Sequence, residues 1–170
     1  MQQQADARAD GPSFGFLTAV DSPVHGLFGG YLVVDALGRP LEFHCTAPQK
    51  VTRAQQILYG PTLHGHLHGQ QIGGALLAES RVTAAVVLTD HDAMLHVRPH
   101  TKLPVALVQA LDGEPPAAGF TLGAARVSPH PQDLADEQAI RERLAELALA
   151  VDLREPFDRI RAAIDEAQRH

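Results

Sequence analysis

The 170-residue chain has no tryptophan, one cysteine and only two lysines. A single cysteine cannot form an internal disulfide, so the fold does not depend on an oxidising compartment. No uncharged apolar stretch is long enough to span a bilayer, and the polar start MQQQADARADG does not have the apolar segment of a signal peptide. We therefore expect a cytoplasmic protein that makes no membrane contact.

Positive charge is also scarce. The chain has 14 Lys and Arg against 20 Asp and Glu, a formal net charge of -6. A protein without a broad basic surface neutralises few phosphates and releases few counterions, so tight binding to nucleic acid is disfavoured. The ten histidines change this balance only near or below their ordinary pKa of about 6.5.

Length and composition indicate one domain of ordinary size, or a core with a small appendage. Aromatic residues make up only 5% of the chain while apolar residues reach 45%, which predicts an aliphatic core. Residues 1–12 are polar and without periodicity, and we expect a disordered leader there. Residues 13–128 are expected to form an α/β core, and residues 129–170 a helical pair packed on it.

The order of elements can be predicted from periodicity and turn residues. Strands are expected at 14–21, 30–37 and 39–46, the last two joined as a hairpin at Gly38. A helical region follows from Val51, interrupted at Gly60-Pro61 and resumed near Ala75. The apolar run over 83–89 is typical of a buried central strand, and further strands are expected at 103–111 and 120–127.

Two amphipathic helices are predicted to close the chain. The first follows Asp133 as a candidate cap, and the second has Pro156 in its first turn. Four residues on their apolar faces should be buried: Leu144, Leu147, Ile160 and Ile164. Exposure of all four would instead mark these helices as the surface for a protein partner.

The stretch from Phe16 to Arg98 resembles the first half of the ribonuclease H family. It has a first strand that ends in an acid (FLTAVDS), a glycine-rich turn and second strand (GLFGGYLVVD), a third strand, a helix from Arg53, and a fourth strand that ends in VVLTD. The resemblance implies a mixed sheet of three antiparallel strands, a crossover helix that returns a parallel strand beside the first, and further strands.

The resemblance also implies a candidate metal site. In the family, acids at the ends of the first and fourth strands hold Mg²⁺ against a scissile phosphate, which assigns this role to Asp21 and Asp90, with Asp136 as a late acid. The two strand-end carboxyl groups should then lie within about 4–6 Å of each other. The carboxylate that the family's helix supplies is missing, because the aligned segment offers Gln55 or Gln56.

The histidine cluster His64-Gly65-His66-Leu67-His68 is a second candidate site. On a helix, His64 and His68 share a face and could bind Zn²⁺ with His91 or Asp92 as third ligand. On a strand, all three histidines point the same way, which resembles the histidine-triad nucleotide hydrolases and transferases. A glycine-broken, partly exposed turn without a ligand is the third possibility.

Two further features of the sequence could support chemistry. Cys45 follows His44 on a strand, where adjacent side chains point to opposite faces, so we expect a buried structural thiol and no nucleophile–base pair. The polar tetrad Thr89-Asp90-His91-Asp92 ends an apolar strand, where α/β sheets commonly place ligands. A functional site is therefore expected near this tetrad.

Two functions remain open after this reasoning. The first is a ribonuclease H-like domain that has lost catalysis and serves as a binding or assembly subunit, favoured by the acidic charge and the missing helix acid. The second is a Mg²⁺-dependent nuclease or phosphoryl-transfer enzyme that uses Asp21 and Asp90. Mg²⁺ would be the cofactor of the nuclease and Zn²⁺ that of the histidine cluster, and no residue pattern specifies a substrate.

Overall fold

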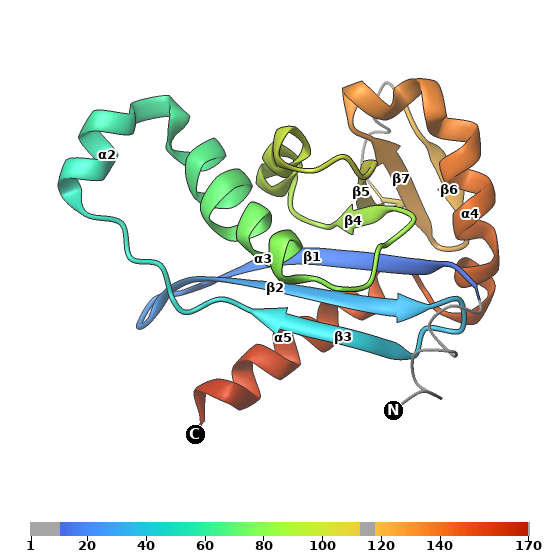
Figure 1. Cartoon of the computed structure of the whole chain (residues 1–170), viewed down its shortest axis with the longest axis horizontal. Coiled ribbons are helices and arrows are strands. Elements are labelled where there is room, and N and C mark those ends of the chain that lie inside the picture. Colours follow the sequence, from blue (N-terminus) through green and yellow to red (C-terminus); the bar gives the residue numbers. More distant parts are fainter. Residues whose placement is uncertain (1–10, 113–117, 170) are drawn as a thin grey trace.

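The computed structural model describes residues 11–112 and 118–169 as a seven-stranded mixed sheet with helices on both sides (Figure 1). The strand order is β3-β2-β1-β4-β5-β7-β6. Most of the predicted leader, residues 1–10, lies outside the described residues, as does part of the loop before the sixth strand, residues 113–117. The α/β architecture and the mixed sheet predicted from the sequence are confirmed.

The first three strands form one antiparallel unit. They are β1 (Ser13–Ser22), β2 (Gly26–Asp35) and β3 (Pro40–Cys45), with the hairpin at Gly38 as predicted. Gly38 has a φ of 82°, a left-handed conformation that glycine adopts without steric cost. The register pairs Phe16 with Leu32 and Thr18 with Gly30, so the apolar positions of the two central strands share faces.

A long helical crossover joins β3 to the next strand. It consists of α2 (Arg53–Tyr59), a 3₁₀ turn η1 (Gly60–Thr62), π-helical turns η2 (Gly65–Gly74) and α3 (Ala75–Glu79). Thr52 and Gln55 form a capping box that starts α2. The crossover returns the chain to β4 (Val87–Thr89), which pairs parallel with β1 as predicted, although the ladder is shorter than the expected 83–89 strand.

The remaining strands complete the sheet. The 3₁₀ segment η3 (Asp92–His100) leads to β5 (Val105–Ala110), which lies parallel to β4. The single strand expected at 120–127 is instead a hairpin of β6 (Phe120–Leu122) and β7 (Ala125–Pro129). Gly123 between them has a φ of 61°, so the chain reverses inside a segment whose apolar pattern alone looked continuous.

Helices α4 (Glu137–Ala150) and α5 (Glu155–Gln168) follow a short 3₁₀ turn η4 (Pro131–Asp136). Their four predicted core residues, Leu144, Leu147, Ile160 and Ile164, are all buried. The prediction that Asp133 caps the first helix is wrong. Asp133 is buried and accepts hydrogen bonds from the Arg98 guanidinium and the Val105 backbone N–H, while Asp136 occupies the cap position of α4.

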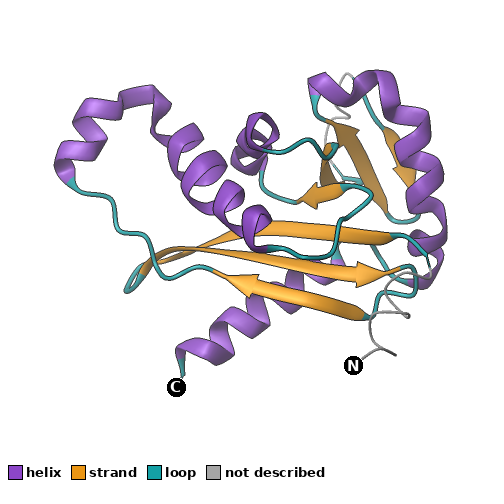
Figure 2. Cartoon of the chain, viewed as in Figure 1, coloured by secondary structure: helices purple, strands orange, loops and turns teal. Residues whose placement is uncertain are grey.

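Helices cover both faces of the sheet (Figure 2), and the core accordingly has two layers, one on each face. One layer packs α4 and α5 against side chains that include Phe14 and Phe16 of β1, whose Phe16 ring meets Phe157 edge to face. The other packs η2, α3 and η3 against side chains that include Leu17 and Ala19. Successive β1 residues thus alternate between the layers, as a strand buried on both faces requires.

Cys45 is exposed at the end of the edge strand β3, so the predicted burial of its thiol is wrong. Cys45 is the last residue of β3, and the local apolar pattern does not show that this strand lies at the edge of the sheet. Among the helices of residues 11–112 and 118–169, none has the length and apolar character needed to cross a membrane.

Candidate functional site

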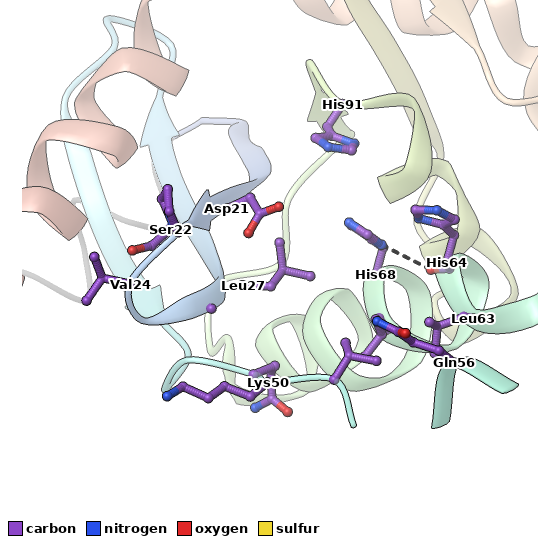
Figure 3. A pocket seen from close by; sticks show the side chains of 15 residues that line it. Asp21, Ser22, Val24, Leu27, Lys50, Gln56, Leu63, His64, His68 and His91 are labelled. Carbon is purple, nitrogen blue, oxygen red and sulfur yellow. Dashed lines mark hydrogen bonds between the residues drawn. The ribbon is translucent and has the colours of Figure 1, made fainter. Parts of the chain in front are cut away.

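A cavity of about 620 Å³ opens where the carboxyl end of β1 meets the crossover helices and the residues that follow β4 (Figure 3). This is the end of the parallel strands, where α/β sheets generally bind ligands. Its polar wall includes Asp21, Lys50, Gln56, His64, His68 and His91. Its apolar wall includes Val24, Leu27, Val51, Leu63 and Leu67.

Three histidines form a stack along one wall of the cavity. The ring centroids of His64 and His68 are 5.5 Å apart, and those of His68 and His91 are 5.2 Å apart, with the planes inclined by less than 30° in each pair. His64 and His68 share a helical face, as the sequence predicted for a helix, and His91 follows β4. His66 points elsewhere and stacks on Tyr59 with centroids 4.3 Å apart.

The central histidine of this stack is a neutral hydrogen-bond acceptor toward the cavity. His68 is buried, and burial lowers its pKa, with His91, His64 and His96 adding repulsion of the charged form. Its Nδ1 lies 3.1 Å from the His64 carbonyl oxygen, which can only accept, so Nδ1 carries the proton. Nε2 therefore holds a free lone pair, and Figure 3 shows this nitrogen on the side of Asp21 and His91.

Two opposite charges line the cavity without partners. Within the described residues, neither the Asp21 carboxylate nor the Lys50 ammonium makes a side-chain hydrogen bond or ion pair. Figure 3 shows the Asp21 carboxylate turned toward His68 and His91, with Lys50 on the far side of the cavity. Nδ1 of His91 is buried and also has no hydrogen-bond partner in the described part of the chain. The cavity thus offers a ligand one exposed carboxylate, one exposed ammonium group and one buried ring nitrogen.

The other strand-end acid, Asp90, faces away from this cavity. Its carboxylate accepts a hydrogen bond of 2.6 Å from the Thr18 hydroxyl and pairs with the Arg161 guanidinium of α5. It lines a separate charged depression between β5 and α5 with Asp152, Arg154 and neighbouring residues. The geometry accordingly does not gather Asp21 and Asp90 into one cavity, and it gives Asp90 a structural role in joining β1, β4 and α5.

Strand parity explains this separation. On β1, Thr18 belongs with Phe16 on the α5 side, while Asp21 continues the Leu17 and Ala19 side. Continuing the β1–β4 register by two residues from Phe16 opposite Leu88 places Thr18, and not Asp21, beside Asp90. The alternation of apolar residues was a sequence signal that could have identified Thr18. The contact between Arg161 and Asp90 joins residues 71 positions apart, and no local pattern in the sequence predicts it.

The remaining candidate ligands do not complete a metal centre. In residues 11–112 and 118–169, no three His, Cys, Asp or Glu side chains are placed to hold one ion together. Stacked imidazoles present their faces to one another, whereas ligation requires ring nitrogens that converge on one point. Asp136 is exposed at the start of α4, Asp92 projects into solvent beside His91, and Gln56 contributes an amide to the cavity.

Glycines hold the histidine-bearing helix close to η3. A Cβ atom on Gly69 would lie 2.4 Å from the His96 carbonyl oxygen, and one on Gly73 would lie 2.7 Å from the Val97 side chain. The glycines therefore do not break the segment into a turn, which was one of the possibilities left open by the sequence. They allow π-helical turns, a geometry often found at functional sites, to pack backbone against backbone.

The strand order, the parallel β1–β4 pair and the crossover between them define the class of protein: the chain has the ribonuclease H-like fold. Solved structures of endonuclease V share this architecture. Human endonuclease V matches with a TM-score of 0.50 and 14% identity, over 98% of this chain and 97% of that one. Endonuclease V of Ciona intestinalis, in complex with an inosine-containing 24mer DNA, matches with a TM-score of 0.52 and 11% identity, over 98% and 96%.

These likenesses carry the fold and its topology. No family model matches the chain, and a search of curated proteins also finds no match. Since a fold hosts many chemistries, what the cavity does has to be argued from its own residues.

Proposed function

We propose that this chain is a ribonuclease H-like binding protein without Mg²⁺-dependent nuclease activity, and that the cavity beside the histidine stack is its binding site. The observation that carries the proposal is the composition of the cavity. In the resembling family, the first strand, the helix and the fourth strand each bring a carboxylate to one point. Here the corresponding elements bring Asp21, His68 and His91 to the cavity.

One carboxylate and two imidazole rings form a poor site for Mg²⁺. This hard cation prefers several oxygen ligands in octahedral geometry, and the phosphoryl-transfer chemistry of the family depends on it. Asp90, the other acid that the resemblance assigned, is held by Arg161 and Thr18 on the opposite face of the sheet. The formal net charge of -6 further disfavours a polyanionic substrate.

The proposal includes an assembly role through α4 and α5, limited to the outer faces of these two helices. The apolar faces of both helices are buried against the sheet. A protein partner that docks on these helices would therefore meet their charged outer faces. The isolated exposed Leu149 is too small an apolar surface to direct docking by itself.

The nuclease alternative rests on the fold and on Asp21, and calorimetry combined with cleavage assays separates it from the binding proposal. MgCl₂ or MnCl₂ titrated into the protein should give no saturable heat, and RNA, DNA and hybrid substrates should stay intact. Divalent-metal-dependent cleavage that disappears in Asp21→Asn or Asp90→Asn would overturn the proposal.

The same variants also report on stability. Asp90→Asn should lower the free energy of unfolding by about 0.5–1.5 kcal/mol, because it weakens the hydrogen bonds to Arg161 and Thr18. Asp92→Asn is the matched control, since its side chain is 88% exposed, and should change stability little. If Asp90 and a second carboxylate instead shared a metal site, Asp90→Asn would relieve their repulsion and raise the free energy of unfolding.

A further inference from the structure

The two unpaired charges of the cavity lie at opposite ends of an apolar wall. Asp21 and the His68 Nε2 lone pair form an acceptor end, and beside it His91 Nδ1 is buried without a hydrogen-bond partner in the described residues, 3.9 Å from the exposed Asp92 carboxylate. Lys50 is at the other end, as Figure 3 shows. Leu27, Leu63 and Leu67 are among the apolar residues of the lining. Such a pocket has a direction, because one end accepts hydrogen bonds and the other donates them.

We infer that the cavity binds a small zwitterion whose primary ammonium group and carboxylate are separated by an aliphatic chain. This inference rests on the proposed binding function of the same site. The ammonium group has three N–H donors and no acceptor, which suits Asp21 together with the acceptor nitrogen of His68. The carboxylate accepts from Lys50, and the aliphatic chain lies along the leucine side chains.

Ligands of either single charge fit this arrangement less well. An alkylamine would leave the Lys50 ammonium unpaired. A fatty acid of the same length would pair with Lys50 but leave the Asp21 carboxylate without a positive partner in the cavity. A volume of about 620 Å³ is typical of a small-molecule site and leaves room for a chain of several methylene groups. A polymeric anion is disfavoured by the Asp21 carboxylate in the lining.

The experiment is a calorimetric titration of the full chain with three ligands of equal chain length: ε-aminocaproate, hexylamine and hexanoate. Shorter and longer ω-amino acids, beginning with γ-aminobutyrate, determine the preferred spacing of the two charges. The zwitterion of best length should bind at least tenfold more tightly than either single-charge analogue. Asp21→Asn and Lys50→Met should each remove most of that advantage.

Two control variants test whether the effect belongs to the cavity. Lys102→Met removes the only other lysine, and Asp112→Asn removes an exposed acid; neither residue lines this cavity. Both should bind the zwitterion as the wild type does. Because Asp21 and Lys50 lie on the surface, their variants should keep the wild-type urea midpoint, so a loss of binding cannot be assigned to unfolding.

The possible results separate this inference from the proposed function. Absence of zwitterion binding to millimolar concentration, or equal binding of hexanoate and the zwitterion, overturns the inference. If in that case the protein also cleaves no nucleic acid, the binding proposal stands with a different ligand. Metal-dependent cleavage that requires Asp21 overturns both, because the carboxylate then serves a metal.

Discussion

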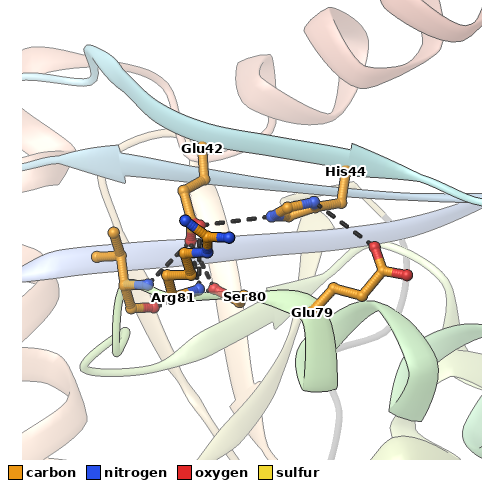
Figure 4. Close-up of polar contacts among 6 residues, drawn as sticks. Glu42, His44, Glu79, Ser80 and Arg81 are labelled. Carbon is orange, nitrogen blue, oxygen red and sulfur yellow. Dashed lines mark hydrogen bonds and ion pairs between the residues drawn. The ribbon is translucent and has the colours of Figure 1, made fainter.

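At the scale of single residues, a carboxylate outside the candidate site accepts hydrogen bonds from several groups. Glu42 of the edge strand β3 accepts hydrogen bonds from the Ser80 hydroxyl and from the backbone N–H groups of Arg81 and Val82, and it contacts His44 (Figure 4). Burial raises the pKa of Glu42, but these hydrogen bonds outweigh burial and lower it to about 2. The carboxylate ties the connection after α3 to β3.

Replacing Glu42 by Gln should therefore destabilise the fold at neutral pH by about 1–3 kcal/mol, because the amide NH₂ group faces backbone donors that it cannot satisfy. The lowered pKa means that the native state holds this carboxyl ionised more strongly than the unfolded chain. Its stabilisation is present above about pH 4.5 and is lost as the pH falls toward 2. Urea unfolding of the wild type and of Glu42→Gln over this pH range should show that the difference between their free energies of unfolding decreases as the pH falls.

Glu79→Gln provides the matched control for this prediction. Glu79 reaches the same His44, at 3.8 Å, but its side chain is 68% exposed. Exposed ion pairs contribute little to stability, so this variant should match the wild type at every pH. Equal losses for the two variants would contradict the role given to Glu42.

At the scale of elements, the packing of η2 on η3 holds the histidine stack in place. The glycines of η2 let the η3 backbone approach, and this contact puts His96 and Val97 directly against the histidine-bearing turns. The sequence HGHLHGQQIGG looks like a flexible turn because glycine is unfavourable in isolated helices. In the fold, close packing overrides that local preference.

Gly69→Ala tests this interpretation. Its Cβ would lie 2.4 Å from the His96 carbonyl oxygen, so η2 and η3 would have to separate, at a cost of about 1–3 kcal/mol. Gly65→Ala is the control in the same element, because its Cβ would meet the His96 ring at an ordinary distance of 3.4 Å. That variant should be neutral or slightly stabilising, since alanine favours helix.

Thermal and urea unfolding of the two glycine variants measure the difference. Zwitterion titration then shows whether the loosened helix still supports binding. If Gly69→Ala is as stable as the wild type, the close approach of the two backbones does not contribute to the fold as described.

At the scale of the whole molecule, two of the ten histidines make stability sensitive to mild acid. Burial lowers the pKa of His68 and of His130 below the ordinary value of 6.5. The unfolded chain consequently binds protons at these sites more readily than the native state does. The free energy of unfolding should fall as the pH drops below about 6.5, well before the carboxylates titrate.

His68→Gln should flatten this acid dependence, because the neutral amide has no proton to gain. His25→Gln replaces an exposed histidine and should leave the profile unchanged. Urea unfolding at several pH values between neutral and mildly acidic conditions measures both variants. A wild-type profile that stays flat through this range would contradict the assignment of His68 as a buried neutral ring.

The sequence by itself determined the architecture. Helix and strand periods, the turn at Gly38 and the apolar faces of α4 and α5 act over a few residues, so their physics can be seen in a short window. This is why the antiparallel unit and the buried Leu144 and Ile164 could be predicted from local patterns, whereas the parallel β1–β4 pair was expected from the resemblance to the ribonuclease H family. The reversal at Gly123 was missed because its strands are only a few residues long.

Only the tertiary structure decided which chemical groups meet. Asp21 and Asp90 end neighbouring strands, yet their side chains leave opposite faces because strand parity and the β1–β4 register act together. Arg161 reaches Asp90 from the last helix, and Lys50 reaches the cavity from the loop after β3. Such contacts join residues far apart in the chain, and their geometry depends on how whole layers pack.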